Sequence, residues 1–223
     1  MVKAILLDIE GTIAPLSFVK EVMFPYSKKK LREFLEKNWE KPEIKKIVQE
    51  VEKIEGRELS LEEAVQLFSR WIDEDRKITP LKELQGHIWE EGFKSGELKA
   101  PLYEDAYEKI KEWKEKGIPV YIYSSGSVKA QNLFFGHSVY GDIRNLFSGF
   151  FDTKIGSKRE RSSYEKIAKE IGLPPHEILF ISDNPEELKA AKEAGMKVIQ
   201  SVREGVEPSG DFEKITSFRE LEI

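Results

Sequence analysis

Short runs of apolar residues, rich in β-branched and aromatic side chains, recur along this 223-residue chain between longer amphipathic stretches. Runs that are apolar on both faces are typical of strands buried in a parallel sheet. They predict strands at Val2–Leu7, Ile118–Tyr123, Ile178–Ser182 and Lys197–Gln200, and a weaker one at Phe150–Phe151.

The stretches between these runs have the spacing of helices. Tyr103–Lys116 and Ser163–Ile171 each end before a glycine, which is a common residue at a helix C-terminus. Asn184 opens another helix with a proline in its first turn and a capping-box Glu, and that helix ends before Gly195. Strands that alternate with helices predict an α/β fold with a Rossmann-like parallel sheet.

Residues 16–99 carry almost no strand pattern and instead show apolar stripes at helical spacing. Four helices are expected, and Ser60 with Glu63 predicts a capping box at the start of the third. These stripes are typical of a helical bundle core. A helical block inserted after the first strand predicts an all-helical cap domain at 16–99 over a core domain built from 1–15 and 100–223.

Composition narrows the classes of function. The chain has 36 basic and 41 acidic side chains and no cysteine, so disulfides and thiolate metal sites are excluded. The acidic balance argues against a nucleic-acid partner. The apolar run before Asp8 has only four residues, Ala4–Leu7, which is shorter than a signal peptide needs, and no segment has the apolar length of a membrane span. We therefore expect a cytoplasmic protein that binds no membrane, and a monomer.

Polar residues follow the predicted strands where a parallel sheet places its functional groups. Asp8–Thr12 follows the first strand and Ser124–Ser127 follows the second. Lys154 and Lys158 come after the weak strand, and Asp183 follows Ile178–Ser182. We expect carboxylates, hydroxyls and a lysine to meet in one crevice.

These residue types make chemical sense together. Asp8 and Asp183 would repel each other unless a cation lies between them, and all-oxygen ligands favour Mg²⁺. Ser125 and nearby backbone amides can hold phosphate oxygens, and Lys158 can neutralise a phosphoryl group in transfer. Asp8 can then act as a nucleophile, while Glu10 protonates the leaving oxygen and later activates water.

Each feature alone also has an ordinary structural interpretation. Asp8 could cap a turn, and Ser124-Ser125-Gly126 is more often a simple turn. Lys154 competes with Lys158 for the same role, and Asp183 could help to cap the following helix. The order of the whole set, with each member after a predicted strand, favours the catalytic interpretation.

The same order of residues resembles the haloacid dehalogenase superfamily of phosphotransferases over nearly the whole chain. Glu10 stands where that superfamily usually has Asp. The sequence around it, Asp8-Ile-Glu-Gly-Thr12, resembles the enolase-phosphatase, or acireductone synthase, family. The segments Tyr121–Ser127, Phe151–Gly156, Leu133–Ser138 and Leu84–Trp89 resemble that family too.

The resemblance implies one Mg²⁺ per chain and a phosphorylated diketone with a methylthio tail as substrate. It implies that Asp8 and Asp183 bind the ion through carboxylates and Glu10 through its backbone carbonyl. Ser124–Ser125 and Lys158 would bind substrate. The catalytic residues would be Asp8, Glu10 and Lys158.

The implied reaction has two stages: a proton leaves the carbon next to a carbonyl to give an enol phosphate, and phosphate is then removed. Glu10 is our candidate for the proton transfer. Whether Glu186 or Glu187 assists Asp183 stays open. One alternative is another Mg-dependent small-molecule phosphatase or phosphomutase of the same superfamily, and another is a non-catalytic phosphometabolite-binding protein.

A methylthio tail requires an apolar niche, for which the helical block offers four aromatic side chains. For any one of them, packing within the bundle core is the more common explanation. The candidates are Phe18, Phe24, Trp89 and Phe93.

Overall fold

The computed structural model describes residues 1–223, which divide into two compact units. One unit contains Met1–Leu16 and Lys99–Ile223, and the other contains Ser17–Leu98. The first unit is built on a six-stranded sheet in the order β3-β2-β1-β4-β5-β6. Every neighbouring pair is parallel, which confirms the predicted α/β fold.

The five predicted strands are present, and the structure adds a sixth that the sequence analysis missed. Their bounds are β1 (Ala4–Leu7), β2 (Val120–Tyr123), β3 (Gly149–Phe151), β4 (Ile178–Ser182), β5 (Lys197–Ser201) and β6 (Lys214–Ile215). The last strand has only two residues and pairs with the end of β5. So short a strand carries no apolar run that a sequence pattern could reveal.

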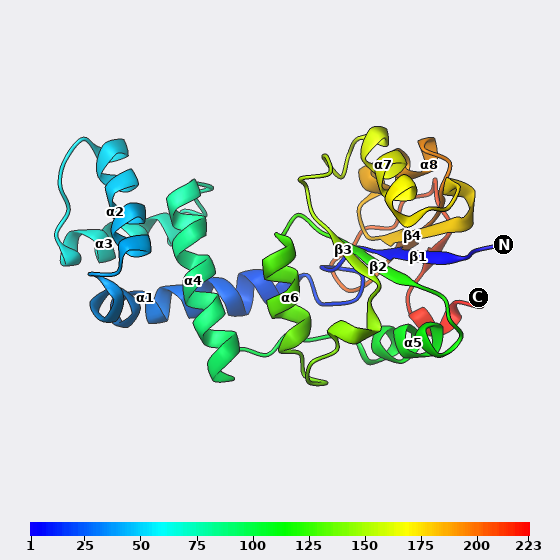
Figure 1. The fold of residues 1–223 in the computed structure, drawn as a ribbon, viewed down its shortest axis with the longest axis horizontal. Coiled ribbons are helices and arrows are strands. Elements are labelled where there is room, and N and C mark those ends of the chain that lie inside the picture. The colour runs from blue at the N-terminus through cyan, green and yellow to red at the C-terminus, as the bar shows by residue number, and fades with distance from the viewer. The chain divides into compact units, whose positions relative to one another are not determined.

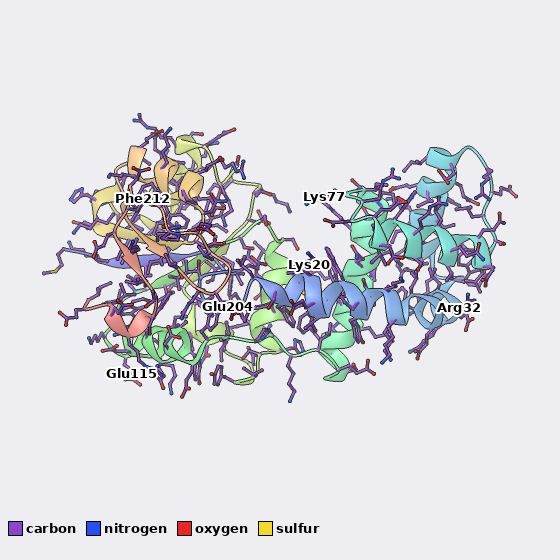
Figure 2. The ribbon with its side chains drawn as sticks, turned by 180° about the vertical axis from the view of Figure 1, so that it is seen from behind. Lys20, Arg32, Lys77, Glu115, Glu204 and Phe212 are labelled. Carbon is purple, nitrogen blue, oxygen red and sulfur yellow. The ribbon has the colours of Figure 1, made fainter.

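The two faces of the sheet bury separate sets of side chains. In β1, Ile5 and Leu7 belong to the hydrophobic cluster that includes α5 (Glu104–Glu115). Ala4 and Leu6 belong to the cluster that includes α7 (Arg161–Ile171) and α8 (Pro185–Glu193). Figure 1 shows α5 on one side of the sheet and α7 and α8 on the other. In Figure 2, Glu115 marks the α5 side and Phe212 the α8 side. Helices therefore cover both faces of the sheet, as expected for strands that are apolar on both faces.

The helices of this unit connect consecutive strands. The α-helices are α5 (Glu104–Glu115), α6 (Val128–Gly136), α7 (Arg161–Ile171) and α8 (Pro185–Glu193). Short 3₁₀ helices lie at η2 (Arg144–Leu146), η3 (Pro175–Glu177) and η4 (Phe218–Glu220). The sequence analysis gave no bounds for α6, which buries only Gln131 and Phe135 and so has a weak apolar face.

The second unit is entirely helical. It contains η1 (Val19–Met23), α1 (Phe24–Asn38), α2 (Pro42–Glu55), α3 (Leu61–Asp73) and α4 (Thr79–Ser95). The four α-helices bury a common hydrophobic cluster, and the capping box of Ser60 and Glu63 is present at the start of α3. The π-helix η1 was not predicted, and it buries no residue. No helix of the chain is long and apolar enough to cross a membrane.

The strand order brings the predicted functional segments together. The chain builds β2 and β3 on one side of β1 and then returns to place β4 on its other side. In open parallel sheets, ligands bind beyond the carboxyl ends of the strands at such a reversal. The residues after β1, β2 and β4 therefore line the favoured position for a site.

Candidate active site

Asp8 directly follows β1 and lies buried at the carboxyl end of the sheet, with only 4% of its surface exposed. Its backbone N–H donates to the carbonyl of Ile181 in β4, which fixes the backbone at the end of the strand. The Lys158 ammonium donates to Asp8 Oδ1 over 2.7 Å. The other oxygen, Oδ2, accepts longer hydrogen bonds from Thr12 at 3.4 Å and Ser182 at 3.5 Å.

Lys158 also contacts a second acid that was not among the predicted site residues. Its Nζ lies 3.0 Å from Glu187 Oε1, and the Ser182 hydroxyl donates to the same oxygen over 3.1 Å. The Asn184 backbone N–H donates to Ser182 Oγ over 3.1 Å, so Glu187 does not accept it in the expected capping box and instead contacts Lys158. Its spacing, four residues after Asp183, is the only sequence signal that could have identified it.

The neighbouring Glu186 behaves differently. It is exposed and pairs with the exposed Arg159, with 2.9 Å between Glu186 Oε2 and Arg159 Nη1. The structure thus places Glu187, and not Glu186, beside Lys158.

Asp183 follows β4, and the turn after Asp8 approaches it closely. Gly11 has a φ of +81°, a conformation that glycine adopts without steric penalty. A Cβ at this position would lie 2.5 Å from Asp183 Oδ2, so only glycine allows the approach. Burial raises the pKa of Asp183 to about 8, and the nearby Asp8 carboxylate contributes to that rise.

Glu10 lies between Asp8 and Gly11 in the same turn and is partly exposed. Burial of its carboxyl raises its pKa, and the charge of Asp8 acts in the same direction. The Lys158 charge partly opposes both effects. The carboxyl of Glu10 therefore lies within electrostatic influence of both Asp8 and Lys158.

Ser124 and Ser125 follow β2, whose Ile122 pairs with Leu7 just before Asp8. Ser124 is buried and its hydroxyl accepts the Gly126 N–H over 3.1 Å, while Ser125 is exposed. The Ser124 side chain thus stabilises the turn, whereas the Ser125 side chain is exposed.

The two candidate lysines are clearly separated. Lys154 is exposed, and its backbone N–H donates to Asp152 Oδ1 over 3.0 Å. Lys158 is buried with its ammonium against Asp8 and Glu187. Burial alone would lower the pKa of Lys158, but these two carboxylates outweigh it and hold the pKa above its ordinary value. Lys158 therefore remains charged.

The charges of the buried side chains near Lys158 indicate whether a cation fits at the end of the sheet. The carboxylates of Asp8 and Glu187 contact the one ammonium of Lys158. Burial, together with the charge of Asp8, raises the pKa of Asp183 and of Glu187. No group of three or more Asp, Glu, His or Cys side chains is arranged to hold a metal by itself. Mg²⁺ usually takes one or two carboxylates and completes its shell with water and substrate phosphate. The pair Asp8 and Asp183 fits that ion.

The aromatic candidates for an apolar niche lie in the helical unit. Phe24 stacks on Trp89 with 6.1 Å between ring centroids, and the Trp89 indole donates to the Met23 carbonyl over 2.8 Å. Phe18 and Phe93 are buried. None of the four belongs to the main hydrophobic cluster of that unit.

Comparisons with known proteins agree with this geometry. Residues 2–195 match the haloacid dehalogenase-like hydrolase family. A relative from Persephonella marina named Enolase-phosphatase E1 is 61% identical over 224 residues, which cover 99% of each chain. Relatives with the same name are 55% identical in a Sulfurihydrogenibium species and 45% identical in Pseudomonas aeruginosa, each over 100% of this chain and 99% of the relative.

Solved structures show the same fold. The crystal structure of the UTR4 protein from Saccharomyces cerevisiae superposes with a TM-score of 0.87 at 35% identity, covering 99% of this chain and 100% of that one. A dehalogenase with an intermediate complex superposes with a TM-score of 0.61 at 17% identity, covering 98% and 95%, and shares the fold alone. The chain therefore belongs to the haloacid dehalogenase-like hydrolases and, within them, to the enolase-phosphatase E1 family.

Proposed function

We propose that this enzyme converts 2,3-diketo-5-methylthiopentyl-1-phosphate into the acireductone 1,2-dihydroxy-3-keto-5-methylthiopentene, in the salvage of methionine from methylthioadenosine. The observation that carries the proposal is the buried Lys158–Asp8 pair, 2.7 Å apart, with Asp183 beside it. It lies in a chain that is 61% identical, over its full length, to an enolase-phosphatase.

In the phosphatase stage, Asp8 is the nucleophile. Its carboxylate attacks phosphorus, the bond between phosphorus and the substrate oxygen breaks, and that oxygen takes a proton from Glu10. Glu10, now ionised, removes a proton from water as the water attacks the aspartyl-phosphate, which releases phosphate and restores both carboxyls. Lys158 offsets negative charge on the phosphoryl group throughout.

In the enolase stage, a proton must leave the carbon next to a carbonyl of the substrate. Glu10 is the candidate base because it shares the turn of Asp8 and its side chain is one methylene longer than an aspartate. Lys158 stays charged and stabilises the oxygen that gains negative charge. Ser124 and Ser125 hold the substrate at the end of β2.

The carboxylates of Asp8 and Asp183 and the backbone carbonyl of Glu10 would hold one Mg²⁺ per chain. When bound, the ion supplies positive charge that offsets the carboxylates and polarises substrate oxygens. Glu187 supports this arrangement because it pairs with the Lys158 ammonium.

We further propose that residues 16–99 act as a cap that recognises the methylthio tail through Phe18, Phe24, Trp89 and Phe93. The protein acts as a cytoplasmic monomer on a small molecule, without a nucleic-acid or membrane partner. Gel filtration of the purified chain tests the monomer directly.

The function is tested by incubating the purified protein and Mg²⁺ with the phosphorylated diketone in D₂O. We expect an absorbing enol, release of inorganic phosphate, and loss of one carbon-bound proton in the NMR spectrum. Common sugar phosphates serve as comparison substrates and should turn over slowly. Rapid hydrolysis of sugar phosphates without any enol would instead favour a general phosphatase or phosphomutase of the same superfamily.

A further inference from the structure

We propose that Tyr123, Ser163 and Tyr164 are positioning residues that hold the loop carrying Lys158 and so aim its ammonium at Asp8. The inference rests on the proposed function, in which Lys158 acts on the phosphoryl group. It assigns a role to three buried hydroxyls that the reaction itself does not use.

The carbonyls of three consecutive residues in this loop each accept a hydrogen bond from a different buried hydroxyl. All three donors are fully buried. The pairs are Tyr123 Oη to the Gly156 carbonyl at 2.7 Å, Ser163 Oγ to the Ser157 carbonyl at 2.6 Å, and Tyr164 Oη to the Lys158 carbonyl at 2.6 Å.

The loop needs such donors because it has no regular structure of its own. Residues 152–160 lie between β3 and α7 in turns and irregular backbone. Backbone carbonyls outside helices and sheets need other donors, and the Ser157 carbonyl also accepts the Glu160 N–H over 3.1 Å. Gly156 has a φ of +143°, and a Cβ there would collide with Ser163 Oγ, so the loop is pressed tightly against α7.

Tyr123 also contacts the other end of Lys158. The Lys158 Nζ lies 5.5 Å from the centroid of the Tyr123 ring, within the range of a cation–π interaction. The Tyr123 and Tyr164 rings pack edge to face, with centroids 5.5 Å apart. One pair of tyrosines therefore fixes Lys158 at its backbone and at its ammonium.

This double attachment matters because lysine is flexible. Its long side chain has many rotamers. Its ammonium, unlike the planar guanidinium of arginine, does not fix the directions of its hydrogen bonds. A displacement of about 1 Å at a reacting group can lower a rate by about a hundredfold. Lys158 contacts the phosphoryl group in the bound substrate and also in the transition state, where charge develops. A misplaced ammonium should therefore lower kcat by a larger factor than it raises KM.

The first test removes one hydroxyl at a time from the Mg²⁺-loaded enzyme, using the phosphorylated diketone as substrate. Tyr164→Phe, Tyr123→Phe and Ser163→Ala should each lower kcat by about three- to tenfold while KM stays within about twofold. Two controls lose a comparable hydrogen bond elsewhere. Tyr26→Phe removes the bond to Glu97, and Ser138→Ala removes the bond to the Gly141 carbonyl. Both controls should keep wild-type kcat.

The second test asks whether the hydroxyls act through Lys158. In a Lys158→Ala background, adding Tyr164→Phe should not lower the residual rate further, because the ammonium that Tyr164 positions is absent. Amide hydrogen exchange supplies a readout independent of activity. The backbone N–H groups of residues 157–160 should exchange faster in Tyr164→Phe, while those of β4 keep their protection.

The outcomes separate the possibilities. An equal loss of kcat with and without Lys158, or a loss shared by both controls, would show a general structural effect and overturn the proposal. Unchanged exchange at residues 157–160 would overturn it as well. If Lys158→Ala alone leaves kcat unchanged, the proposed role of Lys158 in the reaction fails, and exchange still decides whether the hydroxyls hold the loop. Should one variant not fold, the other two decide.

Discussion

The carboxylate of Asp8, the proposed nucleophile, is held in place more firmly at one oxygen than at the other. Lys158 fixes Oδ1, and only long hydrogen bonds reach Oδ2. Asp8→Asn keeps the shape but removes the negative oxygen, so phosphate release should fall by about a thousandfold or more. Phosphate release assays measure this directly. If most activity remains, Asp8 is not the nucleophile.

The two lysines provide a matched pair of substitutions. Lys158→Ala should lower the rate of phosphate release by about a hundredfold or more, because it removes a buried positive charge beside the reacting phosphate. Lys154→Ala should have little effect, since that side chain is exposed. Steady-state kinetics of both variants measure these effects. A large loss of rate in Lys154→Ala with a small loss in Lys158→Ala would assign the charge-neutralising role to Lys154.

Several residues of the site could be predicted because each follows a recognisable strand. Asp8, Lys158 and Asp183 were chosen on that basis, and the structure brings all three together. The choice between Glu186 and Glu187 stayed open because nothing in a helix-opening sequence distinguishes an acid that caps the helix from one that binds a distant lysine. The partner of Glu187 is 29 positions away along the chain, and only the fold brings the two into contact.

At the scale of elements, the turn after β1 depends on one glycine. Gly11→Ala would force a side chain into a left-handed backbone conformation and against Asp183. We expect a loss of about 1–3 kcal/mol in the free energy of unfolding and a large loss of activity. Gly141→Ala is the control, because Gly141 has a φ of +85° with open space around it. Urea unfolding and kinetics should show the strain in both variants but the loss of activity only in Gly11→Ala.

The loop after β5, marked by Glu204 in Figure 2, supports the same turn through Arg203. Its guanidinium donates to the Thr12 carbonyl over 3.2 Å and pairs with Asp105 at the start of α5, with 2.7 Å between Nη2 and Oδ2. Asp105 also accepts the Phe218 N–H over 2.7 Å. Burial alone would raise the pKa of Asp105, but these donors outweigh it and lower the pKa.

This pKa shift makes stability depend on pH in a defined direction. A carboxyl whose pKa is lower in the folded state stabilises the protein above its unfolded pKa, about 3.9, and loses that contribution as pH falls through the folded value. The free energy of unfolding should therefore fall below about pH 4, and Asp105→Asn should be less stable than wild type at pH 7 but converge with it in acid. Urea titrations at several pH values measure the difference. A constant gap at all pH values would contradict the assignment.

The sheet was predictable because buried parallel strands are apolar on both faces, as β4 shows with all five residues buried. The helix α6 and the π-helix η1 were not, because neither has a continuous apolar stripe. Helix α6 is held instead by particular hydrogen bonds. Gln131 donates to the carbonyls of Gly126 and Phe151, and Asp152 accepts the Val128 N–H. Contacts of this kind depend on tertiary structure and leave no periodic signal.

At the scale of the whole molecule, the acidic cluster at the end of the sheet opposes folding in the absence of a cation. The chain has a net charge of −5. Burial and the charge of Asp8 raise the pKa of Asp183 and of Glu187, so ionising these carboxyls in the folded protein costs free energy that a bound cation would offset. Folded protein should therefore bind Mg²⁺ where unfolded chain does not, and a ligand that binds only the folded state stabilises it.

Adding Mg²⁺ at about one hundred times its dissociation constant should raise the free energy of unfolding by about 2.7 kcal/mol, and chelation with EDTA should remove both this increment and the activity. Thermal unfolding with MgCl₂, compared with KCl at the same ionic strength, separates specific binding from screening of surface charge. Asp183→Asn removes one of the two carboxylates assigned to the ion, so its unfolding midpoint should no longer respond to Mg²⁺ although it responds to KCl as wild type does. An equal response to Mg²⁺ in wild type and Asp183→Asn would place the ion elsewhere on the molecule.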